Sequence, residues 1–320
     1  MNSLNLIFEY QERSIPGATR IYLNASSLKV SGCQRRYGLM VNGLKPASAW
    51  VSAESKSILQ TGKALHYFAE QFTRTSGDVV ESIAMAARKY PDVARSVLVA
   101  AGARRPRINL PAPLILNGEP AVEVTFEIPW YSFVYDGRVY QFVLCGTMDH
   151  VAFDGGIFKI YDFKSARGKM IEYVLAKYEH DTQFAFYQWV VWKFKARMNI
   201  PIEMANEIER GHICSYVVPI QLTIKEPTWT IGPARSLTPS QFEEYEATLK
   251  EEMPTLAESY LAAAISPENT QPNGMLNNSC QYCDYKPLCH AKTPREQELA
   301  LSQLEKTEYN PLKRDEDDSI

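Results

Sequence analysis

The pattern of hydrophobic and polar residues divides the chain into alternating helical and extended segments. Residues 120–165 are rich in β-branched and aromatic residues, with turn residues between the apolar runs, which is typical of consecutive strands. We expect helices over residues 24–40, 52–75, 78–102, 182–198 and 238–265, and further strands over 211–224 and 226–234. Two of these helices begin with residues that favour a helix N-terminus, Asn24 and Thr238. This order predicts an α/β fold with a central mixed β-sheet flanked by helices.

Composition places the chain among ordinary globular proteins. It has 320 residues, enough for one large domain or two modest ones, and is 45% hydrophobic and 22% charged. No apolar run approaches the roughly 20 residues that cross a bilayer, and no secretory signal is visible, so we expect a cytoplasmic protein without a membrane partner. The net charge of −3 gives no support for bulk binding of polyanions, although a local basic strip remains compatible with it.

A glycine pair separates two apolar runs in the segment GTMDHVAFDGGIFKIYDFKSA, residues 146–166. If Gly155 and Gly156 form a two-residue turn, paired positions on the two strands sum to 311, and Asp149 lies opposite Asp162. A turn one residue earlier would shift the pairing by two and leave the acids diagonal on one face. A three-residue loop would break the pattern, so the expected pairing is conditional on the turn.

Two opposed carboxylates need something to offset their repulsion. Directly opposed side chains have Cβ atoms about 5 Å apart. At an effective dielectric constant of about 20, two carboxylates at that distance repel by about 3 kcal/mol. A shared proton or a divalent cation would offset this repulsion. Lys164, two residues after Asp162, favours the cation, because metal-assisted phosphoryl chemistry also needs a positive group near the reacting phosphate. The alternative is a surface hairpin with a cross-strand Asp–Lys pair.

Cysteines are the second informative residue type. The six cysteines are Cys33, Cys145, Cys214, Cys280, Cys283 and Cys289. In a reducing compartment, a disulfide framework is not expected. The last three crowd into CQYCDYKPLC, whereas Cys145 and Cys214 lie in apolar strand segments and are expected to be buried thiols.

Five short motifs occur in one order along the chain. GTMD is similar to a G-x-x-D motif, and DFK is similar to (D/E)-x-K. Upstream, GKALH contains Gly62 and His66, and VEVTFE contains Glu123. Downstream, QFAFY contains Gln183 and Tyr187, whose spacing puts both on one helical face. Together these motifs resemble the PD-(D/E)XK nuclease superfamily, specifically its RecB-like branch.

The resemblance implies a restriction-endonuclease-like core and a domain organisation. It implies a nuclease domain over residues 1–292, with a core over about 26–230 and a C-terminal cysteine segment over about 276–292. Residues 293–320, which end in the acidic sequence KRDEDDSI, are expected to form a flexible tail.

The resemblance also implies a metal site. Asp149 and Asp162 would hold one or two Mg²⁺ or Mn²⁺ ions, with His66 and the carbonyl of Phe163 as further ligands. Glu123 would assist through a water molecule.

The remaining catalytic roles fall on three residues. Lys164 would position or activate the attacking water and stabilise the pentavalent phosphorus transition state. Gln183 and Tyr187 would orient Lys164 or the scissile phosphate.

The cysteine pattern is similar to the iron–sulfur staple of CRISPR-associated RecB-like exonucleases and AddB-type nucleases. That resemblance implies a [4Fe–4S] cluster held by Cys33, Cys280, Cys283 and Cys289. The alternative is tetrahedral zinc, held by the same cysteines or with His290 replacing one.

The expected function is hydrolysis of phosphodiester bonds by a metal-dependent DNA nuclease, namely an exonuclease that processes single-stranded ends in recombination or repair. The expected phosphate contacts are Arg35, Arg36, Arg104, Arg105 and Arg107. The alternative for the last three is a solvated loop without a binding role. No phosphate-binding loop of a helicase motor is present, so a helicase, recombinase or annealing protein is a possible partner. The alternatives are a catalytically silent DNA-binding or scaffolding subunit and a site-specific or structure-specific endonuclease.

Overall fold

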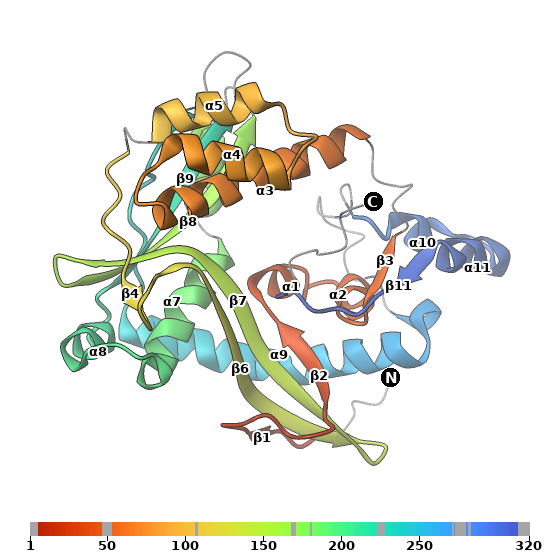
Figure 1. Ribbon diagram of the computed structural model, residues 1–320. Coiled ribbons are helices and arrows are strands. Elements are labelled where there is room, and N and C mark those ends of the chain that lie inside the picture. Colours follow the sequence, from red (N-terminus) through yellow and green to blue (C-terminus); the bar gives the residue numbers. More distant parts are fainter. Residues whose placement is uncertain are drawn as a thin grey trace. The chain divides into compact units, whose positions relative to one another are not determined.

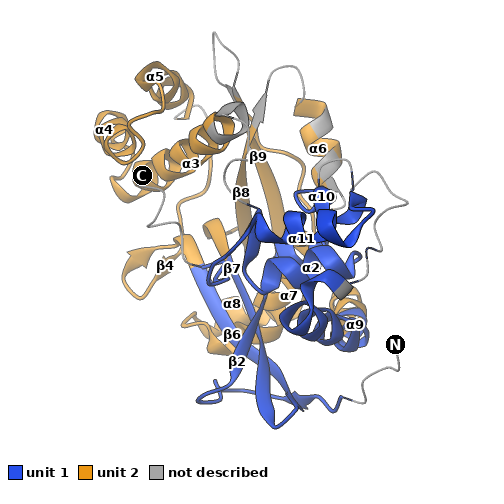
Figure 2. Ribbon diagram, turned by 90° about the vertical axis from the view of Figure 1, so that its right-hand side faces the viewer, with its two compact units in different colours: residues 1–51, 125–146, 247–320 blue, residues 52–124, 147–246 orange. Residues whose placement is uncertain are grey.

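The computed structural model describes most of the chain (Figure 1). The described residues are 6–46, 53–105, 108–167, 171–179, 181–222, 228–270, 272, 280 and 283–312. Within these ranges, no helix is both long enough and apolar enough to cross a membrane. The chain forms two compact units, which Figure 2 colours separately. Unit 1 comprises residues 1–51, 125–146 and 247–320, and unit 2 comprises residues 52–124 and 147–246.

The strands of unit 2 form a mixed sheet. Its members are the second half of β7 (Arg138–Asp154), β8 (Ile157–Arg167), β9 (Ile213–Leu222) and β10 (Thr228–Trp229). β8 pairs antiparallel with β7 and parallel with β9, and β10 pairs antiparallel with β9. The start of β6 (Val122–Tyr135) and the short strands β4 (Ile115–Leu116) and β5 (Glu119–Pro120) also belong to this unit. The α/β fold with a central mixed sheet is confirmed.

Six α-helices accompany the described strands of unit 2. They are α3 (Ala53–Arg74), α4 (Val79–Lys89), α5 (Arg95–Arg104), α6 (Ile171–Glu179), α7 (Thr182–Phe194) and α8 (Ile202–Glu209), with a 3-10 turn at Lys195–Arg197 after α7. The prediction of a single helix over 78–102 is wrong. The segment forms two helices, and the first ends before Tyr90 and Pro91. A residue before proline is disfavoured in helical conformation, so the helix ends there.

The hairpin between β7 and β8 has the expected register. His150 pairs with Tyr161 and Asp154 with Ile157, so paired positions sum to 311. Gly155 and Gly156 have φ angles of 61° and 77°, the left-handed conformation that a two-residue turn of this type requires and that glycine adopts without strain. The expected turn is therefore present, and the paired register runs as far as His150 and Tyr161, directly next to Asp149 and Asp162.

One apolar core of unit 2 lies between the sheet and the helices α3 to α5. Phe68 and Leu65 of α3 are fully buried and pack with Val218 of β9 and Trp229 of β10. A side chain at Gly62 would put its Cβ 3.0 Å from the hydroxyl of Ser165, so the absence of a side chain allows α3 to approach β8 closely.

Unit 1 combines the two ends of the chain. Its strands are β1 (Glu9–Tyr10), β2 (Thr19–Leu23), β3 (Leu44–Pro46), β11 (Leu304–Lys306) and parts of β6 and β7. Its helices are α1 (Ala25–Lys29), α2 (Gln34–Val41), most of α9 (Pro239–Ile265), α10 (Lys286–His290) and α11 (Pro294–Ser302), with a 3-10 turn at Pro267–Asn269. The single helix expected over 24–40 is divided at residues 30–33, although Asn24 forms the expected cap, accepting a 2.7 Å hydrogen bond from Ser27 N.

The chain beyond residue 292 differs from the flexible tail that we expected. Thr293 and Glu296 form a capping box that starts α11, and β11 pairs antiparallel with β3. Tyr309 and Leu312 pack against a small core that contains Tyr22. We call residues 294–312 the C-terminal clamp. The expectation of flexibility is wrong for this segment because its apolar residues contact the N-terminal elements. The acidic sequence KRDEDDSI, residues 313–320, lies outside the described part.

Candidate metal centre and active site

Three side chains of unit 2 form a group that could hold a metal ion. One ligand atom each of His66, Glu123 and Asp149 lies within 4.8 Å of the other two. His66 projects from α3, Glu123 from the start of β6, and Asp149 from β7, and His66 Nδ1 is 3.4 Å from Asp149 Oδ2. Carboxylates with one imidazole suit Mg²⁺ and Mn²⁺. Glu123, expected to act through water, therefore offers an oxygen directly to this group.

The backbone of Glu123 is in an unusual conformation. Its φ angle of 54° is in the left-handed region, which residues with side chains rarely adopt. Such a conformation costs about 1–3 kcal/mol and persists where surrounding contacts enforce it, often at functional sites. Nothing in the segment VEVTFE indicates this conformation.

Asp149 is a buried acid whose negative charge is only partly compensated by its neighbours. Its Oδ2 accepts a 2.7 Å hydrogen bond from the backbone N–H of Phe163 on β8. Burial raises the pKa of Asp149 to about 6, while Lys164 and the Phe163 hydrogen bond oppose the shift. Without a bound cation, the charged form of Asp149 is therefore less favourable than that of an exposed aspartate. The Phe163 carbonyl as a metal ligand stays a prediction.

Asp162 and Lys164 form an ion pair beside this group. Lys164 Nζ is 2.7 Å from Asp162 Oδ2, and the Gln183 amide donates a 2.6 Å hydrogen bond to Asp162 Oδ1. Burial, and then the nearby Asp149, raise the pKa of Asp162, whereas Lys164 lowers it. Both Asp162 oxygens thus have partners, and its role as a metal ligand stays a prediction.

Lys164 is held as an ammonium ion. Burial lowers its pKa, but the attraction of Asp162 and Asp149 outweighs burial, so the pKa of Lys164 is raised overall. The side chain therefore carries a positive charge at neutral pH, close to the carboxylates. This arrangement suits stabilisation of negative charge better than removal of a proton from water.

The first turns of α7 position two further residues at the site. Asp181 caps α7 and accepts a 2.8 Å hydrogen bond from the Gln183 backbone N–H. Tyr187, one turn later, is buried, and burial, Asp162 and Asp149 raise its pKa. Gln183 and Tyr187 also share a hydrogen bond, so they do face the same site.

Tyr178 is a residue of the site that the sequence did not indicate. It lies on α6, and the centre of its ring is 5.6 Å from Lys164 Nζ. An ammonium at this distance from an aromatic ring is attracted to it electrostatically. The spacing of Tyr178 from Gln183 matches none of the motifs, so only the packing of α6 identifies it.

The expected phosphate contact at Arg105 is wrong. Its guanidinium carbon lies 4.9 Å from the centre of the Phe72 ring and 5.8 Å from that of Trp229, and its side chain is buried. Burial lowers the pKa of Arg105 to about 10. Arg104 is half-buried, and Arg107 lies outside the described residues.

The four cysteines of the expected staple lie in unit 1, where each is half-buried. Cys33 lies at the N-terminal end of α2 without a side-chain capping hydrogen bond, and the Cys283 N–H donates to the Cys280 carbonyl at 3.3 Å. Burial raises the pKa of Cys283, with smaller contributions in the same direction from Cys289 and Cys33. The N-terminal and C-terminal cysteines are therefore close enough to affect one another electrostatically.

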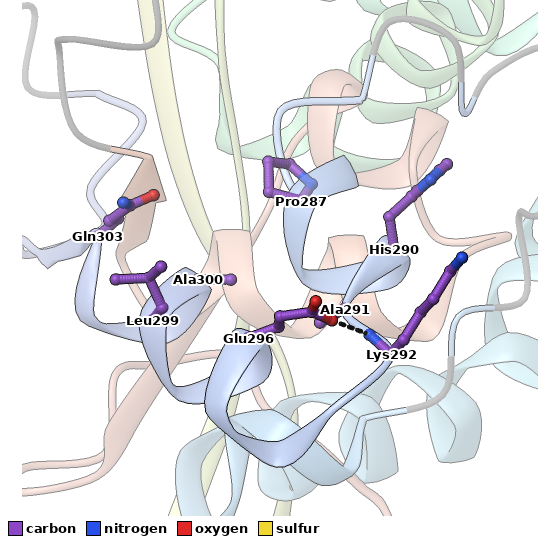
Figure 3. A pocket seen from close by; sticks show the side chains of 8 residues that line it. All are labelled: Pro287, His290, Ala291, Lys292, Glu296, Leu299, Ala300 and Gln303. Carbon is purple, nitrogen blue, oxygen red and sulfur yellow. Dashed lines mark hydrogen bonds between the residues drawn. The ribbon is translucent and has the colours of Figure 1, made fainter.

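The other cysteines and His290 have different surroundings. Cys145 is fully buried as expected, whereas Cys214 is half-exposed, so its expected burial is wrong. His290, the alternative zinc ligand, lines a cavity of about 370 Å³ between α10 and α11 (Figure 3). Lys292, Glu296 and Leu299 also line it.

The chain matches the family model of the PD-(D/E)XK nuclease superfamily over residues 23–290. The chain belongs to the PD-(D/E)XK nuclease superfamily. Nucleases of this superfamily act with divalent metal ions on DNA, and the group of His66, Glu123 and Asp149 meets the need for such an ion. No curated protein gives a match.

Two solved structures are similar to this PD-(D/E)XK nuclease at low sequence identity. A candidate exonuclease from Eubacterium rectale has a TM-score of 0.44 and 14% identity, over 82% of this chain and 88% of that one. The SSO0001 protein has a TM-score of 0.23 and 16% identity, over 54% of this chain and 60% of that one. Both TM-scores are below 0.5, and membership of the superfamily depends on the family match.

Proposed function

We propose that this chain is a metal-dependent exodeoxyribonuclease that processes single-stranded DNA ends. The observation that carries the proposal is the convergence of His66, Glu123 and Asp149 beside the Asp162–Lys164 pair. Action at ends is supported by the resemblance of the cysteine pattern and the α7 motif to end-processing nucleases. A helicase, recombinase or annealing protein would supply the single strand.

The donor set fits a divalent cation. His66, Glu123 and Asp149 would hold Mg²⁺ or Mn²⁺, and Asp162 would join them if it exchanged the Lys164 contact for the ion. A bound cation supplies Lewis acidity, polarising a phosphoryl oxygen and lowering the pKa of a bound water. It also offsets the burial of the Asp149 charge.

The residues of the chain supply position and charge. The Lys164 ammonium lies where it can stabilise the negative charge that develops on the phosphate oxygens in the pentavalent transition state. Gln183 holds Asp162 in one orientation, and the Tyr178 ring limits the movement of the Lys164 side chain. These contacts reduce the reorganisation needed when phosphate arrives.

Substitution of Lys164 tests the proposed activity. Lys164→Ala should lower cleavage by about 10²-fold or more. Mn²⁺ binding and thermal melting of the variant are measured alongside, because Lys164 also compensates the buried charge of Asp162. Lys159→Ala is the matched control, because Lys159 lies on the same strand but pairs with Asp154 beside the turn. Wild-type cleavage by Lys164→Ala, measured on a fluorescent single strand with Mn²⁺, would refute the assignment.

The substrate form separates the alternatives. A strand labelled at either end should lose nucleotides progressively from one end, and a closed circular single strand should remain intact. Cleavage of the circle would show an endonuclease. Absence of cleavage of either strand by the wild-type chain would favour a catalytically silent DNA-binding subunit.

The cysteines would hold a [4Fe–4S] cluster that joins the α2 and α10 segments. Four thiolates complete such a cluster. Zinc–sulfur bonds of about 2.3 Å place the sulfurs of a tetrahedral site about 3.8 Å apart. The resemblance of the cysteine spacing to the iron–sulfur staple favours the [4Fe–4S] cluster over such a zinc site. Broad absorption near the violet and bound iron in anaerobically purified protein are the expected results, and a colourless sample containing zinc would contradict the cluster.

A further inference from the structure

Arg35 does not lie where a phosphate could reach it freely. The side chain is buried, with 8% of its surface exposed, on the first turn of α2. Its guanidinium donates to the Thr270 carbonyl from Nε at 3.0 Å and from Nη2 at 2.6 Å. Nη2 also lies 3.4 Å from the Glu268 carbonyl, and Nε 3.1 Å from the Thr270 hydroxyl. The expected contact of Arg35 with DNA is therefore wrong.

The remaining arm of the guanidinium faces the cysteines. Arg35 Nη1 donates to Cys289 Sγ at 3.5 Å. Within the described part of the chain, the other hydrogen-bond partners of Arg35 are neutral carbonyl and hydroxyl groups, which leave a buried positive charge only partly compensated. A thiolate or a negatively charged cluster supplies the missing charge, and a hydrogen bond to charged sulfur is stronger than one to a neutral thiol.

We propose that Arg35 is a positioning residue of the cysteine site, which orients Cys289 as a ligand and tunes the bound cluster. The inference rests on the proposed [4Fe–4S] cluster. Hydrogen bonds and positive charge at the ligand sulfurs stabilise the more negative, reduced state, so Arg35 raises the reduction potential. Because the same guanidinium holds the backbone at Thr270, it also links the residue that follows the 3-10 turn Pro267–Asn269 to the ligand.

The neighbouring arginine provides a matched control. Arg36 follows directly in the sequence, is half-buried, and lowers the pKa of Cys283 through its charge. Arg36→Gln removes the same formal charge from the same helix turn but leaves the Arg35–Cys289 hydrogen bond in place. A comparison of the two variants separates the effect of charge from that of the hydrogen bond.

The experiment uses the full chain purified without oxygen. Iron per chain, the reduction potential from a titration followed by absorption, and the rate of iron loss to a chelator are measured for wild type, Arg35→Gln, Arg35→Lys and Arg36→Gln. Arg35→Gln should lower the potential more than Arg36→Gln does, and should release iron about 10–100-fold faster than wild type. Arg35→Lys, which keeps the charge, should recover part of the potential.

The outcomes separate this inference from the cluster and from the nuclease activity. A potential and an iron-release rate of Arg35→Gln equal to those of Arg36→Gln would overturn the role of Arg35. If Arg35→Gln does not fold, Arg35→Lys decides, because a wild-type potential in Arg35→Lys would also overturn the role of Arg35.

A wild-type chain that contains zinc instead of iron refutes the cluster. Faster zinc release from Arg35→Gln would still support the positioning of Cys289, and unchanged zinc release would refute it. Lys164→Ala should have wild-type cluster properties.

Discussion

The candidate metal group of unit 2 and the cysteine region of unit 1 are held by different kinds of contact. Around Asp149 and Asp162, buried charges compensate one another through Lys164, and the pKa values of all three groups are shifted. Around the cysteines, side chains instead bind to the backbone: Arg35 donates to the Thr270 carbonyl, and the Tyr285 hydroxyl donates to the Leu44 carbonyl.

This difference predicts different vulnerabilities. A centre built on compensating charge responds to a substitution that removes charge without changing shape, and it responds to pH. A region built on close backbone approaches responds to a single added carbon atom. At Gly43, for example, a Cβ would lie 1.7 Å from the Thr307 carbonyl oxygen of the C-terminal clamp.

The largest expected effect is that of Asp149→Asn. Loss of the carboxylate from the metal group should lower cleavage by about 10³-fold or more, since metal assistance contributes several kcal/mol. The melting temperature without metal should not fall, because Asn can still accept the Phe163 hydrogen bond and removes a buried charge. Thermal melting and strand cleavage are measured together.

Asp154→Asn is the control for that substitution. Asp154 lies on the same strand at the exposed end of the hairpin, paired with Lys159, and its substitution should leave cleavage unchanged. Cleavage by Asp149→Asn within about tenfold of wild type would contradict the prediction. So would a melting temperature well below that of the wild type.

The next effect is a pH dependence of cation binding. In the folded metal-free protein the pKa of Asp149 is about 6, against a usual value of 3.8, because burial disfavours its charged form. The folded state thus holds an extra proton between these values, and the free energy of unfolding contributed by Asp149 falls as pH rises through that window. Cation binding requires the carboxylate, so Mn²⁺ affinity should fall about tenfold per pH unit below about pH 6.

Calorimetric titration with Mn²⁺ between about pH 5 and 7 measures this dependence. An affinity that stays constant across the range would show that Asp149 is already ionised without the cation. The cysteine region belongs to unit 1, outside the group of His66, Glu123 and Asp149, so protein with Cys289→Ser should give the same slope.

Gly43→Ala should have the smallest effect on cleavage, because it changes only a contact within unit 1. Gly43 has a φ of 73° and approaches the clamp, whereas Gly137 has a φ of 68° and no atom within 4 Å of the place that a Cβ would occupy. Gly137→Ala should lower the free energy of unfolding by about 1–2 kcal/mol from backbone strain alone. Gly43→Ala should lower it by about 3 kcal/mol or more, because the clamp must also shift.

Denaturant unfolding and limited proteolysis of the clamp measure these stabilities. The stabilisation of unit 2 by Mn²⁺ should persist in Gly43→Ala, since His66, Glu123 and Asp149 lie outside unit 1. An equal loss of unfolding free energy in the two glycine variants would contradict the prediction, because it would mean that the clamp moves away from the added methyl group at no cost.

Much of the β7–β8 hairpin could be predicted because its geometry is local. Two glycines define a tight turn, and the two-residue period of strands then gives the register as far as His150 and Tyr161, next to Asp149 and Asp162. Likewise, the period of the helix puts Gln183 and Tyr187 on one face, where both contact the site. These relations depend on a few adjacent residues, so their pattern is visible in the sequence.

Other features depend on contacts between residues far apart in the chain, which leave no period in the sequence. The left-handed backbone of Glu123, its place beside His66, and the position of Tyr178 over Lys164 come from the packing of separate elements. From the sequence, Arg35 and Arg105 are expected to be exposed cations, because charge predicts solvation unless a buried partner exists. Their partners, Thr270 with Cys289 and Phe72 with Trp229, are brought near only by the folded chain, which therefore determines that both arginines are buried.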